Sequence, residues 1–139
     1  GRDELLDLIV GAQVGPALGA STLAFVHRYP ASQAALARID PQDSRLALRF
    51  ELYHRGVELA NGYHELLDAE ALLDRNRANN ELRRAEKKYT LPEESRLLAA
   101  MRHGLPACSG CALGFDRLMM VAAGATSIAD VLAFPIDRA

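Results

Sequence analysis

The chain has no long apolar run and no excess of basic residues, and it contains only two cysteines. No stretch reaches the roughly 20 apolar residues that cross a bilayer, and the first residues do not form a signal peptide, so we expect a cytoplasmic protein with no membrane association. The formal net charge of −2 argues against a general nucleic-acid-binding protein, because such domains are usually basic. The 139 residues suffice for one domain with a core but not for two ordinary ones.

The two cysteines, Cys108 and Cys111, form a single Cys-x-x-Cys, a spacing shared by redox motifs and half zinc sites. A zinc site needs two more ligands, and His103 is the only nearby candidate. A thioredoxin-like motif would need a strand before the pair and a helix that opens on it. We therefore interpret the pair as two small residues in a tight loop.

The stretch at residues 109–117 carries the strongest chemical signal. Gly110 and Gly114 have small residues between them, and Arg117 follows three positions later. Small residues let a ligand approach the backbone closely. An arginine at the start of the next helix offers a fixed fork of donors to a phosphate, and the helix N-terminus adds a partial positive charge. The pattern predicts a phosphate-bearing ligand over a glycine-rich strand, followed by a buried helix that ends at Ala123.

A hairpin is predicted within residues 45–65, the most strand-like part of the chain, with a two-residue turn at Arg55 and Gly56. The register that follows from this turn has three pairs: His54 with Val57, Tyr53 with Glu58, and Glu51 with Ala60. Because cross-strand partners share a face of a sheet, the two carboxylates should be diagonal neighbours on one face.

Glu51 and Glu58 would repel each other at that distance unless a cation lay between them or one took up a proton. One interpretation is that their face is exposed and both are ordinary surface charges. The other is a magnesium site, because one or two carboxylates together with phosphate oxygens suit that ion. Phosphates bound near Arg117 would supply the remaining ligands.

The rest of the chain alternates between helical and strand patterns. We expect a helix at residues 3–10, a strand at 23–29, a long polar helix at 68–88 and a second helix from Pro92 to about Gly104. The polar helix carries six basic and five acidic residues, which favours a solvated helix over a nucleic-acid-binding stripe. The whole pattern indicates an α+β domain, with an antiparallel sheet flanked by helices.

Several stretches, taken in order, resemble the class II aminoacyl-tRNA synthetases. Residues 110–117 are similar to the third signature motif of that class, although Ala112 stands where a middle glycine is usual. Residues 50–66 resemble the hairpin of class IIb enzymes, lysyl-tRNA synthetase most closely. Residues 128–135 resemble the C-terminal end of the same enzymes. The resemblance implies an incomplete class II catalytic core.

More narrowly, residues 29–34, 56–66 and 108–114 look like a family of lysyl-tRNA synthetase paralogues, the elongation factor P (R)-β-lysine ligases. That family activates (R)-β-lysine with ATP, through an aminoacyl-adenylate, and attaches it to a lysine of elongation factor P. The resemblance therefore implies ATP and Mg²⁺ as cofactors, elongation factor P and lysine or (R)-β-lysine as partners, and no main role in aminoacylating tRNA.

The resemblance also implies roles for individual residues in binding ATP. Glu51 and Glu58 would hold magnesium and ATP, and Leu52 would offer a backbone contact to the adenine. Arg117 would meet the γ-phosphate as the catalytic residue, and Gly114 would let the nucleotide lie against the strand.

A second set of residues would surround the amino-acid substrate: Glu58, Asn61, Tyr63, Glu65 and Ala112. A carboxylate such as Glu65 can pair with a substrate ammonium group. Strict alternation would put Glu58 and Asn61 on opposite faces of the sheet. Both can line one pocket only if the strand bulges, and we predict a bulge near residues 60–62.

Ala112 is the informative departure from the synthetase pattern. One methyl group on the floor of a pocket changes its shape, although a contact of that size discriminates by only about 1–3 kcal/mol. Neutral drift at a small-residue site is one interpretation. We favour the other, a pocket reshaped away from α-lysine.

The first and second class II motifs have no counterpart in residues 1–139, so we expect a C-terminal portion of a catalytic domain that is inactive alone. Its full-length parent is expected to be a homodimer, and the chain itself to have an exposed sheet edge or apolar surface that favours self-association. Two alternatives remain: the corresponding part of a lysyl-tRNA synthetase, and a non-catalytic nucleotide- or protein-binding module.

Overall fold

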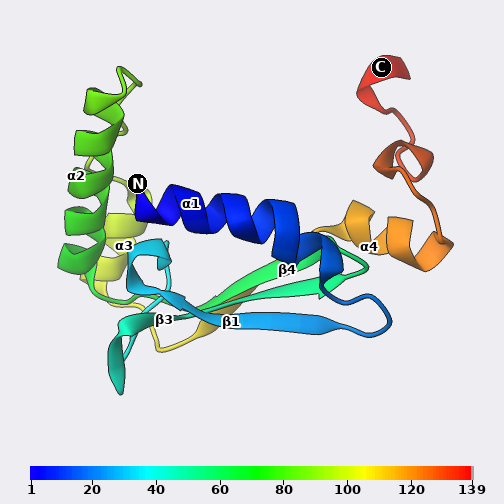
Figure 1. Ribbon diagram of the computed structural model, residues 1–139. Helices are drawn as coiled ribbons and strands as arrows, with labels where there is room; N and C mark the ends of the chain where they lie inside the picture. Colours follow the sequence, from blue (N-terminus) through cyan, green and yellow to red (C-terminus); the bar gives the residue numbers. More distant parts are fainter. Residues whose placement is uncertain (139) are drawn as a thin grey trace.

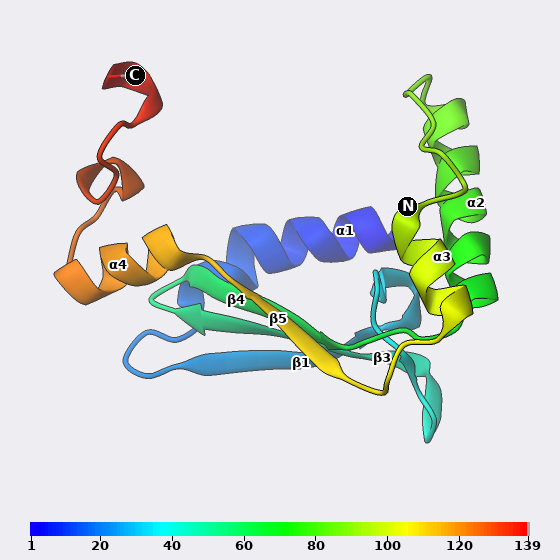
Figure 2. The same ribbon diagram turned by 180° about the vertical axis from the view of Figure 1, so that it is seen from behind.

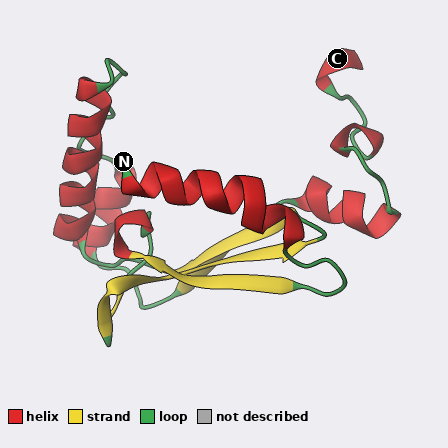
Figure 3. Ribbon diagram, in the orientation of Figure 1, coloured by secondary structure: helices red, strands yellow, loops and turns green. Residues whose placement is uncertain are grey.

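The computed structural model describes residues 1–138, which form an antiparallel sheet with helices over one face and at both ends (Figures 1 and 2). The strands are β1 (Ala24–Pro30), β2 (Ile39–Asp40), β3 (Asp43–His54), β4 (Val57–His64) and β5 (Ser109–Leu113). Their order is β1-β3-β4-β5, with β2 paired to β3, and every pair is antiparallel. The predicted α+β class is therefore confirmed (Figure 3).

The longer helices are α1 (Arg2–Ile9), α2 (Ala69–Ala85), α3 (Arg96–His103) and α4 (Phe115–Ala123). Helix α2 matches the predicted polar helix and begins where the Asp68 carboxylate accepts hydrogen bonds from two backbone N–H groups. Helix α3 begins four residues later than Pro92, because the Ser95 hydroxyl caps it by accepting from the Leu98 N–H.

Helix α1 runs across one face of the sheet (Figure 1). It continues as a π-helical turn (Val10–Val14) and a 3₁₀ turn (Gly15–Ala17), so the loop predicted at Gly11 begins later. Ser32 and Gln33 hold its first turns by donating side-chain hydrogen bonds to Asp3 and Asp7, at 3.0 and 2.7 Å.

Within residues 1–138, the core consists of two small clusters rather than one large one. Leu72, Leu73, Leu98 and Met101 pack between α2 and α3, and three alanines pack beside the sheet. The predicted burial of α4 is wrong, since Phe115 is 66% exposed. This helix continues outward from the end of β5, beyond the sheet (Figure 2). Strand β5 is an edge strand and Phe25 is largely exposed, so the expected open edge and apolar surface are both present.

The hairpin of β3 and β4 contains a bulge. His54 pairs with Val57 and Tyr53 pairs with Glu58, as predicted. The predicted pairing of Glu51 with Ala60 is wrong, because Leu59 is an extra residue and shifts the register by one. Glu51 pairs with Asn61 instead.

The bulge exists as predicted but lies at Leu59, one residue before the predicted range. Its position has a physical cause in the contacts of the strand's carbonyl groups. The Leu59 carbonyl accepts the Gly114 N–H at 2.9 Å, and the Glu58 carbonyl accepts the Arg117 guanidinium at 3.0 Å. The bulge therefore ties the centre of the hairpin to the turn between β5 and α4.

The segment before β1 clasps the tip of the hairpin. The carbonyls of Leu18 and Gly19 accept the N–H groups of Gly56 and Arg55, at 2.8 and 2.7 Å. Gly19 has a φ of +66°, and a Cβ there would lie 2.7 Å from the Tyr53 carbonyl oxygen. Only glycine fits this position without strain.

We expect Gly19→Ala to lower the free energy of unfolding by about 1–3 kcal/mol, because it adds left-handed strain and a backbone clash. Urea denaturation measures the change. The control is Gly11→Ala, a helical position whose Cβ would meet nothing within 4 Å, and which should leave stability unchanged or raised by up to about 1 kcal/mol. Equal effects of the two substitutions would contradict the clasp.

Candidate active site

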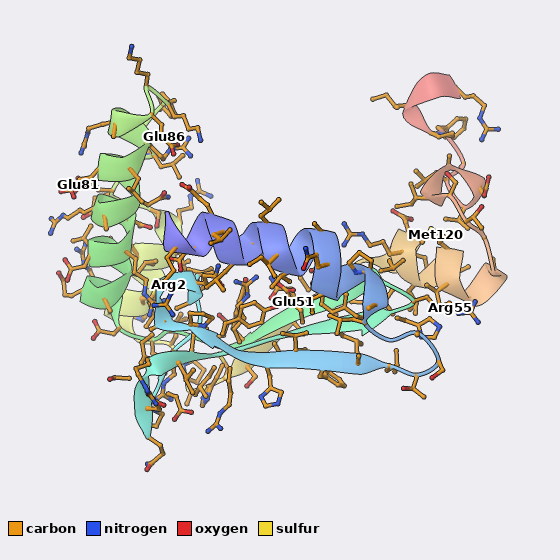
Figure 4. The ribbon with its side chains drawn as sticks, in the orientation of Figure 1. Arg2, Glu51, Arg55, Glu81, Glu86 and Met120 are labelled. Carbon is orange, nitrogen blue, oxygen red and sulfur yellow. The ribbon has the colours of Figure 1, made fainter. Side chains whose placement is uncertain are left out.

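One face of the sheet gathers the polar side chains of three neighbouring strands, and we call it the site face. It carries alternate residues of β3, their partners on β4 and the matching residues of β5. Its members are Arg49, Glu51, Tyr53, Glu58, Asn61, Tyr63, Gly110 and Ala112. Glu51 lies between the sheet and α1 (Figure 4). The bulge brings Glu58 and Asn61 onto the same face, as their predicted roles require.

Glu51 is buried and held from two sides. Arg49 Nη2 donates to its Oε1 at 2.5 Å, and the Tyr53 hydroxyl donates to its Oε2 at 2.7 Å. Burial, followed by the hydrogen bond to Glu51, raises the pKa of Tyr53 above its usual range. Each carboxylate oxygen has two lone pairs and accepts one of these hydrogen bonds, so each keeps one further lone pair.

Glu58 is paired with Arg117 at the bulge. Arg117 Nη1 lies 3.7 Å from Glu58 Oε2 and donates to the Glu58 carbonyl. The site thus brings together the residues predicted to bind phosphate and metal. Each of the two carboxylates already has an arginine beside it, so their negative charges are compensated without a metal ion.

The donor set still fits Mg²⁺, which binds through one or two carboxylates and takes its other ligands from phosphates and water. Glu51 and Glu58 present hard oxygen donors on one face. Among the residues described, no group of three or more histidine, cysteine, aspartate or glutamate side chains could hold a metal ion. A magnesium ion here would therefore depend on ligands from the nucleotide.

Asn61 and Tyr63 form the second half of the site face. Asn61 Nδ2 donates to the Tyr63 hydroxyl at 3.0 Å. Across the strand pair, Ala112 lies opposite Asn61 and Gly110 lies opposite Tyr63. The methyl group of Ala112 is therefore on the same face as the asparagine amide.

Glu65 follows β4, and its backbone N–H donates to the Cys108 carbonyl at 3.0 Å. Its carboxylate lies over the backbone of Gly110, where any Cβ would overlap Glu65 Oε1. Among the described residues, Glu65 makes no ion pair within 4 Å. The predicted partner of a substrate ammonium is thus on the same face as Tyr63 and Ala112.

Two predicted residues lie differently from the rest. Leu52 pairs with Phe25 and Ala60 in the middle of the sheet, and its side chain is on the opposite face, so only its backbone is available for the predicted contact. Gly114 is the N-cap of α4, and a Cβ there would meet only the Arg117 side chain at 3.4 Å.

Sequence reasoning missed Arg49, whose guanidinium contacts both the Glu51 carboxylate and the Asn61 amide. It donates to the Gln33 carbonyl at 3.0 Å and lies 4.3 Å above the centre of the Tyr29 ring. The buried Tyr29 hydroxyl has no hydrogen-bond partner among the described residues, and burial, followed by the nearby Glu51, raises its pKa well above the usual range. The sequence did contain an indication of this role, because the alternation of a strand places residues 49, 51 and 53 on one face.

A cavity of about 390 Å³ opens beside Arg117. Tyr53, Glu58 and Arg117 form one side, and residues 10–16 form the other. A larger cavity of about 530 Å³ lies between residues 31–36 and α2 and contains none of the predicted site residues.

Cys108 and Cys111 are both exposed, and no disulfide joins them. Cys111 lies in β5 and Cys108 immediately before it, so the pair enters an edge strand rather than the start of a helix. This geometry differs from the tight loop expected for the pair and from the helix that a thioredoxin-like motif needs. None of the helices in residues 1–138 is long and apolar enough to cross a membrane.

The antiparallel sheet, the glycine-bearing edge strand and the arginine of the helix that follows define the class II synthetase fold. The chain belongs to the class II tRNA synthetases (D, K and N), whose family profile matches residues 16–138.

Several curated proteins are similar to this chain over almost its whole length. The chain is 49% identical over 138 residues to a Salmonella gallinarum protein named elongation factor P–(R)-β-lysine ligase. Proteins of the same name from Yersinia enterocolitica and Klebsiella pneumoniae are 49% identical over 141 and 138 residues. Each alignment covers 99% of this chain and 42% of the relative, so the chain spans less than half the length of these relatives.

The raised pKa values of Tyr29 and Tyr53 predict a loss of stability at alkaline pH. Both exceed the ordinary value of 10.0 in the folded state, so their contribution is complete below about pH 10 and is lost as the pH rises from there toward the folded pKa. Urea denaturation at a series of pH values should show a falling free energy of unfolding above pH 10. Tyr53→Phe should reduce that slope, whereas Tyr89→Phe, at a 77% exposed residue, should not. An unchanged slope in Tyr53→Phe would contradict the assignment.

Proposed function

We propose that this chain is the C-terminal part of an ATP-dependent ligase that activates (R)-β-lysine and transfers it to a lysine of elongation factor P. The main support is one observation: the sheet carries Glu51, Glu58 and the Asn61 amide on one face, and the Arg117 guanidinium of α4 lies 3.7 Å from the Glu58 carboxylate. The names of relatives at 49% identity support the choice of substrate and acceptor.

The nucleotide would occupy the side of the site face near Arg117. This arginine is half-exposed and opens onto the cavity of about 390 Å³, so a triphosphate can reach it. Glu51 and Glu58 would hold Mg²⁺, which when bound supplies positive charge to the phosphates. Gly114, whose backbone lies against the Arg117 side chain, would let the nucleotide lie close to the strand.

The amino acid would occupy the side formed by Asn61, Tyr63 and Glu65. The Glu65 carboxylate has no competing ion pair among the described residues, and a substrate ammonium would pair with it. Ala112 would form part of the floor beside Asn61.

The reaction then requires alignment more than covalent help. The substrate carboxylate attacks the α-phosphorus of ATP, the bond to pyrophosphate breaks, and an aminoacyl-adenylate forms. A lysine amine of elongation factor P attacks the acyl carbon, which forms an amide, releases AMP and loses a proton. Arg117 would stabilise the charge that develops on the phosphates, and the substrate-binding residues would fix the attacking carboxylate in place.

A lysyl-tRNA synthetase is the second candidate, because the matching family consists of tRNA synthetases. Ala112 favours the ligase over this alternative. A non-catalytic nucleotide- or protein-binding module would share the fold but would not turn over ATP.

ATP–pyrophosphate exchange by the full-length parent tests the proposal. We expect exchange that depends on (R)-β-lysine, a lower kcat/KM with α-lysine, and no exchange by residues 1–139 alone. A strong preference for α-lysine would favour the synthetase. No exchange, together with no thermal stabilisation of the parent by ATP and Mg²⁺, would favour the non-catalytic module.

Ala112→Gly tests the role of the methyl group in substrate choice. Removing it should raise the α-lysine to (R)-β-lysine ratio of kcat/KM by roughly tenfold, within the 1–3 kcal/mol of one small apolar contact. Ser109→Ala is the control, because Ser109 is on the same strand and the opposite face. A ratio that does not change in Ala112→Gly would indicate neutral drift at this position.

A further inference from the structure

We propose that Arg49 is a positioning residue that joins the two halves of the site, fixing Glu51 on the nucleotide side and Asn61 on the amino-acid side. This inference rests on the proposed function. Arg49 is in the middle of β3, and its side chain is only 18% exposed. We do not propose that it contacts the nucleotide or the amino acid directly.

The contacts of Arg49 reach both halves of the site at once. One terminal nitrogen donates to Glu51 Oε1 at 2.5 Å, and Nε lies 3.4 Å from Asn61 Oδ1. The contact with Oδ1 turns the amide so that Nδ2 donates to the Tyr63 hydroxyl. A single planar group therefore sets the directions of a proposed metal ligand and of a proposed substrate ligand.

Two further contacts fix the guanidinium itself. Its other terminal nitrogen donates to the Gln33 carbonyl at 3.0 Å, and its plane covers the Tyr29 ring. Gln33 in turn donates from its side-chain amide to Asp7 of α1 at 2.7 Å. Arg49 is thus anchored to the segment that holds α1 over the site.

The chemistry of these partners requires arginine rather than any cation. A guanidinium presents five donors in a rigid fork, whereas lysine is a single point charge on a flexible stem. Lysine at position 49 could neutralise Glu51 but could not also reach the Gln33 carbonyl and Asn61 in fixed directions. Arg49→Lys should therefore separate the neutralisation of Glu51 from the orientation of Asn61.

The test uses the full-length parent with Arg49→Lys, Arg49→Met and the control Arg45→Met. Arg45 is on the same strand, but its side chain is 85% exposed and its partner is Asp43. Calorimetry measures the affinities for Mg²⁺ with a non-hydrolysable ATP analogue and for (R)-β-lysine. Exchange kinetics give kcat and KM, and thermal denaturation gives Tm.

We expect Arg49→Met to weaken both affinities by roughly 10- to 100-fold, the range for lost hydrogen bonds to charged groups. Arg49→Lys should return the nucleotide affinity to within about threefold of wild type, while the affinity for the amino acid stays about tenfold weaker and its KM stays raised. Arg45→Met should match wild type within about twofold, as expected for an exposed ion pair.

Four results would overturn the inference. Arg49→Lys could restore both affinities, which would reduce Arg49 to a charge. Both Arg49 variants could match Arg45→Met, which would show that Arg49 positions neither ligand. Both could instead lose affinity only in proportion to the drop in Tm, which would make the residue merely structural. A wild-type parent that binds neither ligand would overturn the proposed function as well, whereas the other outcomes occur in an active enzyme and concern Arg49 alone.

Discussion

The bulge at Leu59 is the constraint on which the geometry of the site depends. An inserted residue moves every later side chain of a strand to the other face. Before the bulge Glu58 faces the site, and after it Asn61 and Tyr63 face the site. The same irregularity directs two neighbouring carbonyls toward the Gly114 N–H and the Arg117 guanidinium. One extra residue therefore sets both the contents of the site face and the position of its exposed arginine.

The two arginines of the site face differ in how firmly they are held. The Arg49 side chain is only 18% exposed, lies 2.5 Å from its carboxylate partner and also contacts the Gln33 carbonyl and the Tyr29 ring. Arg117 is 49% exposed and lies 3.7 Å from Glu58, and exposed pairs of this kind contribute little to stability. A phosphate can compete with Glu58 for Arg117 at low cost, whereas displacing Arg49 would leave the buried Glu51 carboxylate without its cationic partner. Arg117 is thus the arginine available to a ligand.

Sequence patterns predicted the structural elements that are determined by residues close together in the chain, such as the β3–β4 hairpin. The turn at Arg55 and Gly56 and the alternation of β3 were sufficient for the hairpin and its first two pairs. The position of the bulge could not be predicted from the strand, because it depends on contacts with Gly114 and Arg117, more than 50 residues away. The burial of α4 was inferred from its apolar composition alone.

The site residues divide in the same way. Glu51, Glu58 and Arg117 were found because their chemistry is unusual at their spacing, and Glu58 and Arg117 are indeed neighbours at the bulge. Arg49 was missed because a single arginine in a strand is typical of a solvated edge. Only the low exposure of its side chain and the convergence of its four partners point to a different role.

The two small residues of β5 that face the site, Gly110 and Ala112, differ in what lies above them. Gly110 and Ala112 both point onto the site face, but the space above Gly110 is filled by the Glu65 carboxylate. A side chain at position 110 would displace the group that is proposed to bind the substrate ammonium. At position 112 the neighbouring group across the strand is Asn61, and the alanine methyl is exposed. A methyl group at 112 can therefore change the volume offered to a ligand without moving a charged partner, which makes this position suited to discriminate between amino acids of similar charge.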